Sequence, residues 1–286
     1  MKRPTAGLTL IELLVGLALI GIVLATLLSL TIGTARPSAA LQARNDLLPE
    51  LQTAQNYMAG KLREAVYIFP AGLSFSLAGS GNTLKSPSGS YNWTIGTDPM
   101  VAFIVPPRSV VSPTSTTLGG CASGSDNDKY CYAFYAFYAI KRADLVNPTG
   151  ADSRTNNPGP DASNDANAWV LMEYRGYYTT SVLGYTASGY STTLTNIPGA
   201  TTNGGSSGRL LMDYLQPMTG TIPLFTAPST GPQVAGQTNM KMNLAARQAA
   251  PGQIVRLPNN LLNTDPAAFN TLTVYPRNVG KPQLLN

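Results

Sequence analysis

The residues that could carry out chemistry are few, and they exclude the common catalytic arrangements. The chain has no histidine and only two cysteines. Ser-His-Asp and Cys-His nucleophilic sites, and zinc sites that contain histidine, therefore cannot be built from it. A Walker A loop, a dinucleotide-binding glycine motif and a pair of catalytic acids are also missing. The composition indicates a non-enzymatic protein with no cofactor and no small-molecule substrate.

One carboxylate, Glu12, lies in an unusual place. It is the single charge between Leu8 and Ile32, inside a continuous apolar run. A charged side chain at the centre of a bilayer costs roughly 2.5–3.5 kcal/mol on insertion scales, and such residues are functional by default. Glu12 therefore needs a partner, and we expect no nearby residue of the chain to supply one.

Two acidic segments have oxygen ligands of the kind that calcium prefers. The first is Asp126-Asn127-Asp128, which lacks the spacing and the closing glutamate of an EF-hand loop. The second contains Asp161, Asn164 and Asp165 and lacks the same features. We predict no metal site at either.

The stretch around Glu12 is long enough to cross a membrane as a helix. A hydrocarbon core of about 30 Å needs roughly 20 apolar residues at 1.5 Å each. Lys2 and Arg3 precede the stretch and would hold the N-terminus on the cytoplasmic side. A secretory signal peptide would have a shorter apolar region with its small residue after it. A plain membrane anchor fits the length but does not explain Glu12.

This N-terminus resembles that of type IV prepilins and type II secretion pseudopilins. The matching features are a short basic leader that ends in Gly7, the run from Leu8 to Val15, and the glutamate at position 12. Leu8 stands where the family usually has phenylalanine. The resemblance implies that a prepilin peptidase cleaves between Gly7 and Leu8 and that the new amine of Leu8 is methylated. It also implies that Glu12 pairs with the N-terminal amine of a neighbouring subunit during assembly.

Beyond Ile32 the sequence predicts that the helix continues and becomes amphipathic. Apolar residues recur at three- and four-residue spacing, among them Leu41, Leu48, Leu51 and Met58. This pattern predicts one apolar stripe that faces a core, on a helix that reaches about Phe69.

Pro37 and Pro49 fall inside this predicted helix. Each removes a backbone donor and clashes with the preceding turn, so we expect a kink or a break near both. The family resemblance also suggests that the segment around Pro37 loosens when subunits pack into a filament.

After Pro70 the helical period disappears, and apolar runs of strand length alternate with turn-rich segments. Strands are predicted at 73–77, 91–95, 100–105, 130–140, 168–174, 209–215, 239–244, 253–257 and 272–275. Run 130–140 has aromatic residues at both even and odd positions, which face opposite sides of a strand. This pattern predicts a central strand covered on two faces, one of them by the helix. Long loops are predicted at 147–167 and 184–208.

The two cysteines, Cys121 and Cys131, enclose a short loop. In an exported protein, cysteines this close are expected to form a disulfide, and two free thiols are the alternative. A loop of this size would gain roughly 2–3 kcal/mol from the bond by chain-entropy estimates.

Charge is distributed unevenly along a chain whose formal net charge is +5. Acids predominate in 126–173, and bases predominate from 174 onward. Because the bases are scattered singly, solvated charge or pairing with the acidic segment of a neighbouring subunit is favoured over nucleic-acid binding. DNA binding by the basic C-terminal half, as in a DNA-uptake pilin, is kept as an alternative.

These features predict an α+β protein of type IV pilin-like architecture, with a long N-terminal helix packed on an antiparallel sheet with long loops. Its expected parts are a cleaved leader (1–7), a transmembrane helix (8–33), an amphipathic helix (34–69) and a β-rich head (70–286). The chain looks most similar to PilW-type minor pilins.

The expected function is that of a minor pilin, a structural subunit that is incorporated in, or primes, a type IV pilus for adhesion, twitching motility or DNA uptake. A type II secretion minor pseudopilin is the alternative. The resemblance implies four kinds of partner: the major pilin, other minor pilins, the prepilin peptidase and the inner-membrane assembly platform. The expected location is the inner membrane, with the head outside the cytoplasm, and then the pilus at the cell surface.

Overall fold

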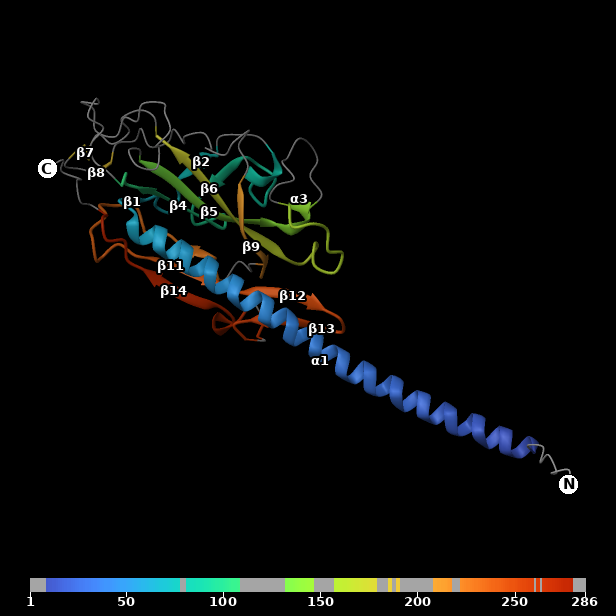
Figure 1. Cartoon of the computed structure of the whole chain (residues 1–286). Helices are drawn as coiled ribbons and strands as arrows, with labels where there is room; N and C mark the ends of the chain where they lie inside the picture. The colour runs from blue at the N-terminus through green and yellow to red at the C-terminus, as the bar shows by residue number, and fades with distance from the viewer. Residues whose placement is uncertain are drawn as a thin grey trace, which may run out of the picture.

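The fold consists of one long helix that runs into a β-rich head (Figure 1). The structure is a computed structural model that describes residues 9–77, 81–108, 132–146, 157–178, 185–186, 189–190, 208–217, 222–259, 261–262 and 264–279. The helix, α1 (Leu10–Glu64), packs its C-terminal half on an antiparallel sheet. The predicted α+β, type IV pilin-like architecture is thus confirmed.

The main sheet is antiparallel and has seven strands in the order β1-β4-β5-β6-β9-β12-β13. These strands are β1 (Tyr67–Ile68), β4 (Met100–Val105), β5 (Ala133–Lys141), β6 (Trp169–Tyr177), β9 (Arg209–Leu215), β12 (Ala246–Ala250) and β13 (Gln253–Leu257). Strands β9 and β12 pair at a single position, Leu215 with Ala246. The sheet curls around α1, so that the helix contacts both β4 and the β12–β13 hairpin.

Smaller elements surround this sheet. A three-stranded sheet contains β10 (Phe225–Thr226), β11 (Met240–Leu244) and β14 (Asn270–Val274). Two hairpins are formed by β2 (Ser74–Ser76) with β3 (Asn92–Thr94) and by β7 (Tyr185–Thr186) with β8 (Gly189–Tyr190). The short helices are η1 (Asn82–Leu84), α3 (Arg142–Val146) and η4 (Pro266–Ala268). The sequence did not predict β1, β10, β12 or α3, and β7 and β8 lie in a predicted loop.

Helix α1 ends at Glu64 rather than at about Phe69, so the predicted C-terminal boundary is wrong. Ala65 has extended backbone dihedrals, and the amides of Val66 and Phe69 donate to carbonyls of β4. The apolar pattern continued past Glu64 because the chain passes directly from a buried helix face to a buried sheet edge. The helix's terminal carbonyls also find partners: those of Arg63 and Glu64 accept from the backbone amide of Arg277 and the side chain of Asn278.

Strand β5 is central and buried on both faces, as predicted. Phe137 and its alternate neighbours belong to the core beneath α1. Phe134 and the residues of opposite parity belong to a second core, with Trp93 and Phe75 from the β2–β3 hairpin. The hairpin and η1 therefore supply the second layer that the aromatic pattern required.

The buried stripe of α1 differs from the predicted one in its rotation about the helix axis. Leu51 and Met58 are buried as predicted, but Leu41 and Leu48 are exposed. The buried residues are Ala43, Leu47, Leu51, Ala54, Gln55, Met58, Ala59 and Leu62. Alanines on this face allow the sheet to approach closely, a contribution that a stripe of large apolar residues alone does not reveal.

Candidate functional site

The N-terminal part of α1 is an apolar surface that the described head does not cover. An 18-residue window of the helix has a mean hydropathy of 2.7 with none of it buried, so the helix is long and apolar enough to cross a membrane. Figure 1 shows this part extending away from the head. Its exposed large side chains are Leu10, Ile11, Leu13, Leu14, Val15, Leu17, Leu19, Ile20, Ile22, Val23, Leu24, Leu27, Leu28, Leu30 and Ile32.

Glu12 and Thr9 together form a capping box at the start of this helix. The backbone amide and the hydroxyl of Thr9 both donate to Oε2 of Glu12 at 2.9 Å. The amide of Glu12 donates back to the Thr9 hydroxyl oxygen at 3.4 Å. This reciprocal arrangement satisfies donors that a helix N-terminus leaves open, and the helix dipole favours a negative charge there.

The expectation that no nearby residue supplies a partner for Glu12 is therefore wrong for hydrogen bonds. Thr9 is a neutral partner, however, and it leaves the negative charge of a carboxylate uncompensated. Sequence reasoning missed this role of Thr9, although Thr9-Leu10-Ile11-Glu12 before an apolar run has the pattern of a capping box. The box fixes the glutamate at the very end of the apolar helix.

The other predicted site residues are only partly within the described chain. Gly7 and Leu8, the predicted cleavage and methylation site, lie outside the described residues, as do Cys121 and Cys131, so those assignments stay predictions. Pro37 and Pro49 both lie inside α1. The helix continues through them without a break, and the kinks stay a prediction.

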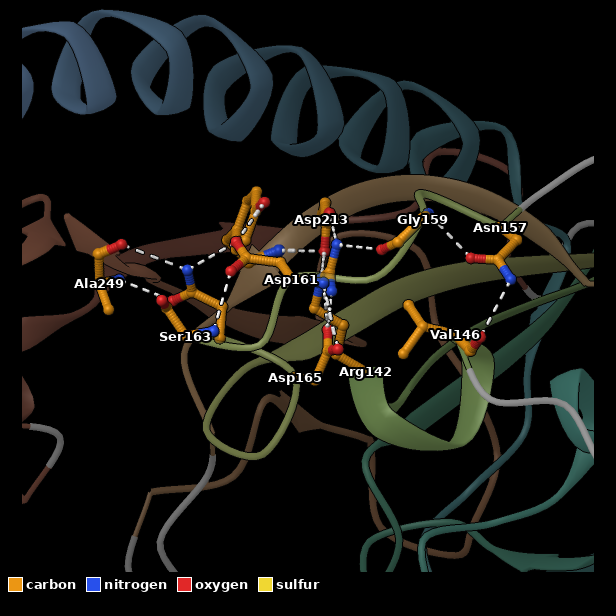
Figure 2. A network of polar contacts seen from close by, with 11 residues as sticks. Arg142, Val146, Asn157, Gly159, Asp161, Ser163, Asp165, Asp213 and Ala249 are labelled. Atoms are coloured by element: carbon orange, nitrogen blue, oxygen red, sulfur yellow. Dashed lines mark hydrogen bonds and ion pairs between the residues drawn. The ribbon is translucent and has the colours of Figure 1, made fainter. Parts of the chain in front are cut away.

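The head contains a buried ionic network centred on Arg142, at the start of α3 (Figure 2). The guanidinium group is 1% exposed and donates two bonds to Asp213 of β9, at 2.9 and 3.1 Å. It also pairs with Asp165 and donates to the carbonyl of Gly159. Two carboxylates thus compensate one buried cation.

The same network connects elements that are distant in the sequence. Asn164 bonds through its side chain to both the amide and the carbonyl of Ala249 in β12. The amide of Asp213 donates to Glu50 of α1 at 2.6 Å. Turn 161–167, β9, β12 and α1 are therefore held together by polar contacts.

Asp161 and Asp165 accept hydrogen bonds from donors of the protein itself. Asp161 accepts hydrogen bonds from Asn164, Tyr214 and the amide of Ser163, while Asp165 faces Arg142. In the described part of the chain, no group of three or more His, Cys, Asp or Glu side chains could hold a metal ion. The bond to Asp161 adds to the effect of burial, and together they raise the pKa of Tyr214 to about 12.

A second buried carboxylate, Glu173 of β6, lies beneath α1. It is 3% exposed and accepts a hydrogen bond from the hydroxyl of Tyr57 at 2.9 Å. Its other oxygen has no hydrogen-bond partner among the described residues. Burial raises the pKa of Glu173, against the lowering effects of the Tyr57 bond and of the charges on Arg209 and Lys61.

Basic side chains lie over aromatic rings of β5 and β6, which the sequence did not predict. The guanidinium of Arg175 is 5.5 Å from the Tyr135 ring centre and 4.9 Å from that of Tyr177, and the Lys61 ammonium is 5.7 Å from Tyr135. Both rings are buried. They are parts of the core and not a platform on which bases could stack.

Comparison with known protein families finds a match for the N-terminal segment. Residues 2–28 match the family model described as the prokaryotic N-terminal methylation motif. The matched segment contains Gly7, Leu8 and Glu12, and it supports a protein of the type IV prepilin and pseudopilin family. The comparisons with curated proteins and with solved structures found no match.

Replacing Arg142 with methionine should destabilise the head by about 3–5 kcal/mol, because the buried Asp213 and the partly buried Asp165 lose their counter-charge. The change is measured by denaturant unfolding of the full chain in detergent, followed by tryptophan fluorescence. Lys241→Gln removes an exposed cation and should change stability by less than about 0.5 kcal/mol. Equal effects of the two substitutions would contradict the role given to the network.

Replacing Glu173 with glutamine should change how stability depends on pH. The folded pKa of Glu173 is raised, so the ionised form destabilises the native state. The wild type should therefore lose stability relative to Glu173→Gln as the pH rises from the pKa of Glu173 in the unfolded chain through its higher pKa in the folded protein. The difference between the two unfolding free energies is measured across pH 4 to 9. Asp46→Asn, at an exposed position of α1, is the matched control.

Proposed function

We propose that this chain is a minor type IV pilin, a structural subunit without enzymatic activity. In this proposal α1 holds the subunit in the inner membrane, with the head outside the cytoplasm. A prepilin peptidase removes residues 1–7, and the amine of Leu8 is then methylated. The subunit is later incorporated in, or primes, a pilus that also contains the major pilin and other minor pilins.

The observation that carries the proposal is the uncovered apolar surface of α1. About 20 residues of apolar helix cannot remain in water, and the described head offers them no cover. Lipid covers such a surface before assembly, and the apolar helices of neighbouring subunits cover it afterwards. The match to the methylation motif supports this exchange of surroundings.

Glu12 supplies specificity to a contact between helices that is otherwise apolar. The capping box keeps its carboxylate at the first turn of α1, close to where cleavage after Gly7 would create a positively charged amine. In a dry helix bundle, an unpaired carboxylate is costly, and pairing it with a neighbour's amine removes that cost. Thr9 holds the carboxylate ready for this partner by bonding one of its oxygens.

Replacing Glu12 with leucine should abolish assembly and leave the fold of the head unchanged. The variant keeps the apolar helix but lacks the group that pairs with the neighbouring amine. Assembly is measured as the amount of the subunit in sheared pili, beside its native partners. Glu64→Gln, at the exposed C-terminal end of the same helix, is the matched control. Normal incorporation of Glu12→Leu would exclude the ion-pair mechanism.

Replacing Gly7 with a bulky residue such as phenylalanine should block removal of the leader. The small residue before the apolar run is the expected recognition point of the peptidase, and intact mass would show residues 1–7 retained. Gly16→Ala, within the apolar helix, should be processed normally.

Deleting the whole subunit should reduce piliation and leave exoprotein release unchanged. The opposite result would assign the subunit to a type II secretion filament.

A further inference from the structure

The β12–β13 hairpin touches α1 at the point where the helix leaves the head (Figure 1). The side-chain amide of Gln253 donates to the carbonyl of Arg36 at 2.9 Å. At the hairpin tip, Gly252 has a φ of +79°, and a Cβ there would lie 3.0 Å from Nε of Arg36. The positive φ favours glycine at this turn, and the close neighbour of the tip is the flexible side chain of Arg36.

This contact fixes the distance of the tip from the apolar segment. Arg36 lies four residues beyond Ile32, which is about 6 Å along a helix. The polar headgroup layer of a bilayer is of similar thickness, roughly 5–7 Å on each side. A membrane that surrounds the apolar part of α1 therefore brings its headgroups to the level of the hairpin tip.

The hairpin has a basic, partly apolar face that points away from the helix. Ala246, Val255 and Leu257 belong to the core under α1, so the alternate residues lie on the opposite face. There Arg247 and Arg256 are directly paired across the two strands, and Ile254 is 37% exposed near the tip.

Two like charges at directly opposed positions are unfavourable without an anion between them. Residues 246–257 contain no acid, and no ion pair among the described residues joins Arg247 or Arg256 to a carboxylate. Arg247 donates to the backbone carbonyl of Asn167, and the charge of Arg256 adds to burial in lowering the pKa of Arg247. The nearby acids of turn 161–167 are engaged within the ionic network around Arg142.

We propose that the β12–β13 hairpin rests on the anionic lipid surface from which α1 emerges, with Ile254 among the headgroups and Arg36, Arg247 and Arg256 facing lipid phosphates. The two strand arginines lie about 10 Å from the tip, and their long side chains can reach back toward the surface. The contact orients the head above the membrane before assembly. This inference rests on the proposed membrane-held precursor.

The test places a tryptophan at the tip of the full chain, in anionic vesicles whose headgroups carry a nitroxide quencher. Ile254→Trp should be strongly quenched. Val234→Trp is the matched control, because Val234 is 46% exposed and its neighbour Gln233 bonds Ile68, beyond the far end of α1. That end of the head is about 42 Å from Arg36 along the helix, so its added emission should not be quenched.

The dependence of tip quenching on charge distinguishes binding of the tip to anionic lipid from simple closeness of the tip to the membrane. Combining Ile254→Trp with Arg247→Gln and Arg256→Gln should lower the bound-to-free ratio of the tip by about fivefold for each arginine removed. Zwitterionic vesicles or high salt should have a similar effect.

Three results would overturn the proposal: equal quenching at the two positions, no response to the arginine substitutions, or a change in tip fluorescence with duplex DNA but not with vesicles. Vesicle flotation is measured on the same samples. A chain that floats but shows no tip quenching contradicts only the hairpin contact, whereas a chain that does not float contradicts the membrane-held precursor itself.

Discussion

The apolar surface of α1 is the constraint on which the rest of the molecule depends. The surface from Leu10 to Ile32 must be covered by something other than the described head. Lipid and a bundle of helices differ in how well they accommodate the apolar side chains and Glu12. Lipid tolerates the leucines and isoleucines but penalises the Glu12 carboxylate. A bundle of like helices accepts both, provided that a cation meets the carboxylate. In the proposed function, the helix would therefore exchange lipid for a helix bundle only where such a cation is present.

The head packs around the C-terminal half of this helix. The curled sheet contacts α1 from β4 to β13, and Glu50 and Tyr57 connect the helix to β9 and β6 by polar contacts. Buried ion pairs add little net stability over apolar packing, but breaking one is costly. Arg142 and its carboxylates join α3, turn 161–167 and β9, and the loss of Arg142 would leave both carboxylates without their counter-charge.

Local patterns predicted much of the fold. The bounds of β4, β9 and β13 agree with the sequence because each is a short apolar run between turn residues. The end of α1 and the rotation of its stripe were missed, since both depend on strands far along the chain. Burial of Arg142 could not be predicted at all: its main partner, Asp213, lies 71 positions away, and an isolated arginine carries no signal of its surroundings. Thr9, by contrast, was predictable from the glutamate three residues later.

The contacts that secure α1 have a consequence for the order in which the protein is made. Gln253 meets Arg36 across 217 positions, Asn270 meets Gln55 across 215, and Asn278 meets Glu64 across 214. The helix is therefore completed by segments that are synthesised more than 200 residues after it. Contacts of such long sequence separation form slowly, so the apolar helix can enter the bilayer while the head is still an unfolded chain. Late completion of this kind fits the proposed function, in which the head lies outside the cytoplasm and would cross the membrane before it folds.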